Sequence, residues 1–206
     1  LTHKGEQAPP VTLADGTKVW LNAASKLYFP LAFAGKTREV FLSGEAYFEV
    51  AKDHSHPFVV NIGTNKIEVL GTHFDVMAYN EEPCAYTTLL EGSVRISSSN
   101  GNAMLTPGQQ GEINSNGAIH IKTVDVEQSV AWLHGQLPMD GTDILAFMRA
   151  VSRWYNVDIV YSGKPPVLNF SGSLDKQTPL PQLLNALNAN GIHCELKDRK
   201  IILYGK

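Results

Sequence analysis

The sequence is poor in cysteine, in net charge and in long apolar runs, and each shortage excludes a class of protein. Two cysteines, Cys84 and Cys194, are too few and too far apart for a disulfide framework or a zinc cluster, so we expect two half-buried thiols; the alternative is a single bridge between the two ends of the chain. The formal charge is −3 and the pI about 6.2. Nucleic-acid-binding proteins usually carry an excess of basic residues, so this class is excluded. The longest apolar run, residues 27–35, contains Pro30 and falls short of the roughly 20 residues of a membrane-spanning helix.

The chain begins at Leu1, without an initiating Met, and its first residues do not form a signal peptide. We therefore expect a soluble fragment of a longer protein. Charged residues make up 18% of the chain, below the roughly 25% of average globular domains, which favours an exported, β-rich protein.

Residues 40–50 alternate in polarity as a half-buried β-strand does. Apolar side chains share one parity, and carboxylates and a tyrosine share the other: Val40, Leu42, Ala46, Phe48 and Val50 against Glu45, Tyr47 and Glu49. Short runs of this kind continue to about Val124, separated by dipeptides typical of turns: Asp15–Gly16, Ser43–Gly44, Glu91–Gly92, Asn100–Gly101, Pro107–Gly108 and Asn116–Gly117. The pattern predicts an all-β domain over residues 1–124, built from short antiparallel or solenoid-like strands.

After Val124 the apolar period changes from two to about 3.6 residues. Residues 125–135 are expected to form a short connecting helix, followed by an α+β domain over 136–206. Two helices are predicted, capped by Thr142 and by Thr178, 36 residues later, and ending at Asn156 and at Asn190–Gly191. Each is flanked by strand-like segments, so we predict a duplicated βαβ unit with the strand 168–174 between the copies and a final hairpin through Asp198–Arg199.

No arrangement of residue types supports catalysis or cofactor binding. Glu45 and Glu49 are four residues apart on one strand, about 13 Å, whereas the two carboxyls of a glycosidase lie roughly 5 to 9.5 Å apart. His54 and His56 share one side of an extended segment, but no carboxylate follows in the next few residues to complete a metal site. His193 adjoins Cys194, yet adjacent strand residues point to opposite faces. We therefore predict no catalytic, cofactor-binding or metal-ligating residues.

Five motifs follow one another along the first half of the chain: the opening VTLADGTKVWLNAASKLYFP, GEAYFEV at Gly44–Val50, LGTHFDV at Leu70–Val76, TLLEGSVRI and LTPGQQ. In sequence and in order they resemble the FecR family of periplasmic anti-sigma signalling proteins. The second half resembles the small domain that follows FecR domains and is similar to the STN module, through WLHGQLPMD, SRWYNVDIVY and NFSGSLDKQTPLPQLLNAL. Met139, preceded by Pro138, stands where that family usually has a Phe, and a Met fills a similar core gap.

The resemblance implies a non-enzymatic role in signal transduction and transcription regulation. The chain would be the periplasmic part of a single-pass inner-membrane protein, with a transmembrane helix and a cytoplasmic anti-sigma segment upstream of Leu1. Its partners would be the N-terminal signalling domain of a TonB-dependent outer-membrane receptor and, through the cytoplasmic segment, an extracytoplasmic-function sigma factor. The alternative is a carbohydrate-binding β module, in which Trp20, Tyr28, Tyr47 and Tyr79 line a groove.

The last strand is the candidate partner-binding site. A βαβ sheet with a terminal hairpin leaves an edge whose unpaired main-chain groups accept another strand. Lys200, Ile201, Ile202, Leu203 and Tyr204 are predicted to form that edge. The alternative is that residues 157–161, VDIVY, hold the outer place.

Overall fold

The computed structural model describes residues 1–6, 8–139, 142–165 and 172–205. It divides into an N-terminal unit, Leu1–His3 with Gln7–Val130, and a C-terminal unit, Lys4–Glu6 with Ala131–Lys206. The division between Val130 and Ala131 falls within the predicted connecting segment, although residues 4–6 join the second unit. Among the described residues, no helix combines the length and apolar character needed to cross a membrane.

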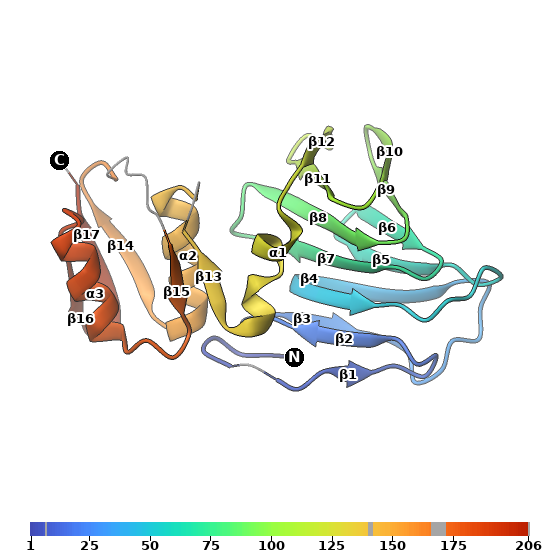
Figure 1. Cartoon of the computed structure of the whole chain (residues 1–206), viewed down its shortest axis with the longest axis horizontal. Helices are drawn as coiled ribbons and strands as arrows, with labels where there is room; N and C mark the ends of the chain where they lie inside the picture. The colour runs from blue at the N-terminus through green and yellow to red at the C-terminus, as the bar shows by residue number, and fades with distance from the viewer. Residues whose placement is uncertain (7, 140–141, 166–171, 206) are drawn as a thin grey trace. The chain divides into compact units, whose positions relative to one another are not determined.

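The N-terminal unit is a twelve-stranded β structure whose layers enclose one hydrophobic core (Figure 1). Its strands are β1 Val11–Thr12, β2 Lys18–Leu21, β3 Lys26–Tyr28, β4 Arg38–Glu49, β5 Phe58–Ile62, β6 Asn65–Val69, β7 His73–Ala78, β8 Cys84–Glu91, β9 Val94–Ser98, β10 Gly101–Leu105, β11 Gln109–Asn114 and β12 Ile119–Thr123. The main path runs β10-β9-β6-β5-β4-β7-β8-β11-β12, and β4–β5 is its parallel pair. The all-β prediction is confirmed, but the solenoid-like version is wrong, because the strands curl around a shared core.

The long strand β4 belongs to both halves of this structure. Its first part pairs with β5, from Arg38 to Phe41, and its second part pairs with β7, from Gly44 to Glu49. The predicted turn at Ser43–Gly44 is therefore wrong, since both residues lie inside a continuous strand. Gly44 has φ +108° and lies so close to Ser25 that a Cβ atom would be 2.4 Å from its Oγ. The glycine permits a close approach where the strand changes partners.

The alternation in β4 is confirmed on its apolar side. Val40, Ala46 and Phe48 are fully buried in the core. The predicted solvated face is wrong, because Glu45 and Tyr47 are also buried. The Glu45 carboxylate remains hydrogen-bonded there, since it accepts a 2.6 Å bond from the Asn22 side-chain amide.

The short segment after β12 forms two helical turns rather than one helix. Helix α1 is Val126–Ser129, capped by Asp125, and the 3₁₀ turn η1 is Ala131–His134, which contains the buried Trp132. The described residues before Val126 contain no helix, as the sequence predicts.

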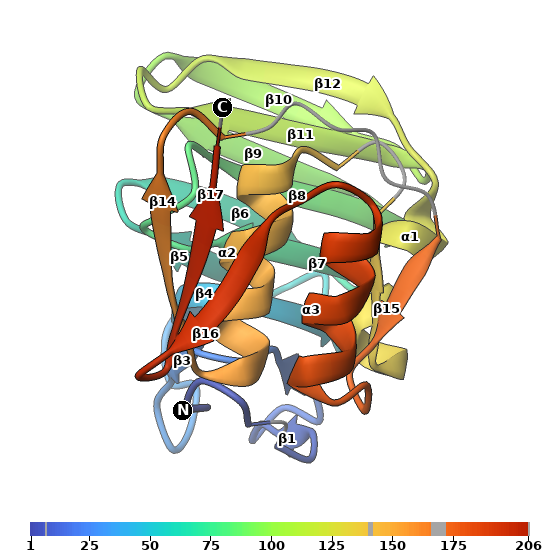
Figure 2. The same ribbon diagram turned by 90° about the vertical axis from the view of Figure 1, so that its left-hand side faces the viewer.

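After the 3₁₀ turn η1, the described part of the C-terminal unit contains two α-helices and five strands: β13 Gln136–Pro138, α2 Ile144–Tyr155, β14 Asp158–Ser162, β15 Ser173–Asp175, α3 Leu180–Ala189, β16 Cys194–Lys197 and β17 Lys200–Tyr204. Figure 2 shows both helices with the three-stranded sheet. The strand–helix–strand order occurs twice, but strands pair between the copies: β13 with β15, and β14 with β17. The two strands of each expected βαβ unit thus lie in separate sheets. Residues 168–171 of the predicted strand 168–174 lie outside the described residues.

The helix ends differ slightly from those predicted. Asp143, not Thr142, caps α2, because its carboxylate accepts the N–H groups of Leu145 and Ala146. Asn156 ends this helix in the left-handed conformation, as predicted. Helix α3 is preceded by Pro179 without a side-chain cap, so the predicted cap Thr178 is wrong. The final hairpin turns at Asp198–Arg199, both with positive φ, as expected.

Candidate functional site

The predicted binding strand lies in the middle of its sheet. The order is β14-β17-β16, with β17 parallel to β14 and antiparallel to β16. Ile201 and Leu203 are 0% and 1% exposed in the core of the C-terminal unit, while Lys200 and Tyr204 are exposed. The edge assignment for Lys200–Tyr204 is therefore wrong, because both sides of the strand are already paired. The run of three apolar residues, 201–203, was the available signal, since central strands are apolar on both faces.

The β16 edge of the sheet is closed by a side chain that imitates a neighbouring strand. The Asn188 amide donates from Nδ2 to the Cys194 carbonyl at 2.9 Å and accepts the Cys194 N–H at 3.1 Å. Asn188 lies on α3, so the helix supplies both partners that a strand would otherwise offer. Lys197 follows on the same strand and is exposed, a feature that discourages edge pairing.

The β14 edge is the open one. Asp158 donates its N–H to Arg199 at 3.0 Å, and Ser162 accepts from the Gly205 N–H at 2.8 Å, so both residues direct their main-chain groups towards β17. Because these directions alternate along a strand, Ile159 and Tyr161 direct theirs away from it. No strand pairs with that side among the described residues.

The outer face of this sheet is partly apolar. Val160 is 40% exposed and is paired in register with the half-buried Ile202, which in turn pairs with Glu195. The Tyr204 hydroxyl donates to the Glu195 carboxylate, and this hydrogen bond raises the pKa of Tyr204. An apolar strip next to an open edge, bordered by polar groups, suits a protein partner.

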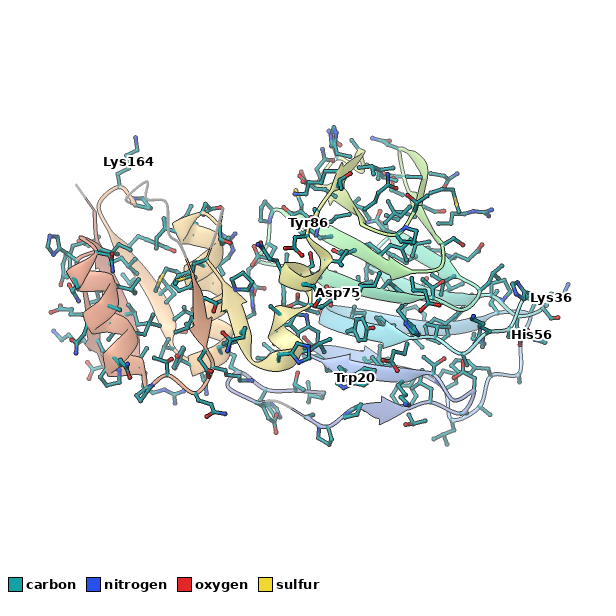
Figure 3. All side chains as sticks on the ribbon, viewed as in Figure 1. Trp20, Lys36, His56, Asp75, Tyr86 and Lys164 are labelled. Atoms are coloured by element: carbon teal, nitrogen blue, oxygen red, sulfur yellow. The ribbon has the colours of Figure 1, made fainter. Side chains whose placement is uncertain are left out.

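The histidine pair considered for metal binding lies in a surface turn. His56 Nδ1 is 2.8 Å from Asp53 Oδ2, and this hydrogen bond lowers the pKa of Asp53 (Figure 3 labels His56). His54 is exposed. The described residues contain no group of three or more His, Cys, Asp or Glu side chains arranged to hold a metal ion.

Both cysteines are free thiols, but only Cys84 is half-buried as predicted. Cys84 is half-buried on β8 and donates to Glu112 at 3.3 Å, whereas Cys194 is buried on β16. Burial raises the pKa of both thiols. Neither thiol is therefore an activated nucleophile.

The aromatic residues considered for a carbohydrate groove do not come together as a group. Trp20 on β2 packs against Tyr47 on β4, with ring centroids 5.5 Å apart (Figure 3 labels Trp20). Tyr79 is buried and donates its hydroxyl to the Ala23 carbonyl at 2.7 Å. Tyr28 alone of the four is well exposed, at 64%.

Comparisons with known proteins match both halves of the chain. The profile of the FecR protein family matches residues 2–95, and that of the FecR C-terminal region matches residues 136–203. Two crystal structures of a candidate anti-sigma factor from Parabacteroides distasonis ATCC 8503 are similar over 100% of this chain and 97% of theirs, at 32% identity, with TM-scores of 0.90 and 0.89. A search of curated proteins found no match. The chain therefore belongs to the FecR family.

Proposed function

We propose that this chain is the signalling region of an anti-sigma regulator and acts by protein–protein contact rather than by catalysis. The observation that carries the proposal is the similarity, over the full length of this chain, to a candidate anti-sigma factor at 32% identity. The site geometry is compatible with it: the thiols are not activated, and the carboxylate Glu45 is held by Asn22.

The finer expectations follow from family membership. The chain is the periplasmic part of an inner-membrane protein, connected by a membrane helix to a cytoplasmic segment that binds an extracytoplasmic-function sigma factor. The signal comes from the N-terminal signalling domain of a TonB-dependent outer-membrane receptor. The STN-like C-terminal unit is the part that receives it.

We assign the receptor contact to the open edge at β14 in place of β17. The main-chain groups of Ile159 and Tyr161 pair with a strand of the receptor domain, and the apolar strip of Val160 and Ile202 packs against its side chains. The β16 edge does not compete, because Asn188 already bonds to Cys194 there.

The test compares two substitutions at one position. Tyr161→Ala and Tyr161→Pro both remove the ring, but the proline also removes an N–H that points away from β17. Calorimetric titration with the receptor signalling domain should show binding by the alanine variant and at least about tenfold weaker binding by the proline variant. Far-UV circular dichroism controls for folding.

Two outcomes separate the surface from the function. Equal affinities of the two variants refute the β14 contact. The signalling role is refuted if two results occur together. No receptor signalling domain binds the chain, and deletion of the full-length regulator leaves sigma-dependent transcription unchanged.

A further inference from the structure

A cleft with a mixed polar and apolar lining opens in the N-terminal unit beside β4. Its volume is about 460 Å³, and it lies between the turn that joins β5 to β6, the loop between β7 and β8, and the turn after β11. The pairing of β4 explains its position. Strands β5 and β7 pair with the same side of β4, one after the other. Pairing with β5 ends at Phe41 and pairing with β7 begins at Gly44, which leaves a gap between β5 and β7 that Leu42 and Ser43 border.

The lining of the cleft contains no cationic side chain and is rich in hydrogen-bonding groups. Ser43, Asn65 and Asn80 contribute a hydroxyl and two amides that have no hydrogen-bond partner among the described residues. The lining contains one carboxylic acid side chain, that of Glu82, and no Lys, Arg or His. Such a surface matches a neutral ligand with many donors and acceptors, and it offers no cation to an anionic one.

An exposed aromatic pair, outside the cleft lining itself, lies on the neighbouring strands β3 and β4. Tyr28 on β3 and Phe41 on β4 are directly opposite in register, and they are 64% and 55% exposed. Phe41 and Ser43 are on the same face of β4, about 7 Å apart along the strand. This spacing is close to the length of one sugar ring, so consecutive rings of one chain would reach both places.

From this arrangement we infer that the N-terminal unit binds a neutral oligosaccharide, a function separate from the proposed contact at β14. One sugar ring lies with its C–H face on Phe41 and Tyr28, and the next ring hydrogen-bonds to Ser43, Asn65 and Asn80 in the cleft. Aromatic rings offer a flat apolar surface at little cost in conformational entropy. Amide and hydroxyl side chains supply the donor and acceptor groups that sugar hydroxyls need. A peptide is the weaker fit, because the part of β4 left unpaired beside the cleft is only Leu42 and Ser43, too short an edge for pairing with another strand.

The inference is tested by nuclear magnetic resonance titration of the full chain with four hexasaccharides: cellohexaose, maltohexaose, hexa-N-acetylchitohexaose and the anionic hexagalacturonate. At least one neutral hexamer should shift the amide signals of residues 41–43, 65 and 80 in a saturable manner at millimolar concentration. Phe41→Ala and Asn65→Ala should each weaken that binding about tenfold. Met104→Ala is the matched control, because Met104 is 53% exposed on β10 and lies outside the cleft lining.

Three results would overturn the inference. The first is no saturable shift with any of the three neutral hexamers. The second is equal or tighter binding of hexagalacturonate, which contradicts a lining that has no cationic side chain. The third is binding that the Phe41 and Asn65 variants leave unchanged while their spectra show an intact fold.

Discussion

Replacing Gly44 with alanine tests how the N-terminal unit is held together. This glycine lies where β4 leaves β5 and joins β7, at φ +108°. An added Cβ would lie 2.4 Å from the side-chain oxygen of Ser25 and 2.7 Å from its α-carbon. Because the α-carbon belongs to the backbone, a change of side-chain rotamer at Ser25 cannot relieve the clash.

The magnitude follows from two separate costs. An L-residue with positive φ costs roughly 1–2 kcal/mol. Forcing an extra methyl group into a packed site costs about 1–3 kcal/mol more. Gly44→Ala should therefore reduce the free energy of unfolding by about 2–5 kcal/mol, a large part of the roughly 5–15 kcal/mol that holds a domain folded.

Gly16→Ala is the matched control. Gly16 has φ +86°, but nothing lies within 4 Å of the Cβ position. This variant carries only the backbone cost of about 1–2 kcal/mol. Urea denaturation followed by circular dichroism, with hydrogen exchange of the β4 amides to report on the N-terminal unit, measures both. A Gly44→Ala variant no less stable than Gly16→Ala would refute the argument that close approach to Ser25 requires the glycine.

Three further predictions concern charge, pH and helix termination. Asp15→Asn should destabilise the N-terminal unit by about 3–5 kcal/mol, because it leaves the buried charge of Arg38 without its ion-pair partner. Arg38 is 3% exposed and lies 2.7 Å from the Asp15 carboxylate. Thermal melts measure the loss of stability, and a loss under about 1 kcal/mol contradicts the prediction. Burial raises the pKa of Tyr47 and Tyr86 from 10.0 to about 12. Their stabilising contribution is therefore complete below pH 10 and is lost as the pH rises to about 12. Ultraviolet titration should show two tyrosines that ionise late, and pKa values near 10 for both would disprove the burial argument. Asn156 has φ 52°, a conformation that glycine adopts easily and alanine does not. Asn156→Gly should therefore stabilise the C-terminal unit by a few tenths of a kcal/mol up to about 1 kcal/mol, and Asn156→Ala should destabilise it by a similar amount. Calorimetry that finds the alanine variant more stable than the glycine variant counts against this account.

Local patterns predicted the elements that depend on neighbouring residues. The period of two placed Val40 and Phe48 in the core of the N-terminal unit. The period of 3.6 predicted the helix α2, whose Phe147 and Val151 lie in the core of the C-terminal unit. Asn156 was identified as a helix end because its side chain tolerates the left-handed conformation. Burial of a repeating face and the φ preference of one residue are properties that a short segment carries by itself.

Pairing between distant segments was decided only in the tertiary structure. The motif at Gly44 has the composition of a turn, yet it lies inside a continuous strand, where the backbone passes close to Ser25, nineteen positions earlier. Glu45 alternates as a solvated residue would, and it is buried because Asn22 reaches its carboxylate. Side-chain polarity alternates in the same way in a strand at the edge of a sheet and in one at its centre. The order β14-β17-β16, and with it the open edge at β14, therefore depended on which long-range strand pairs form.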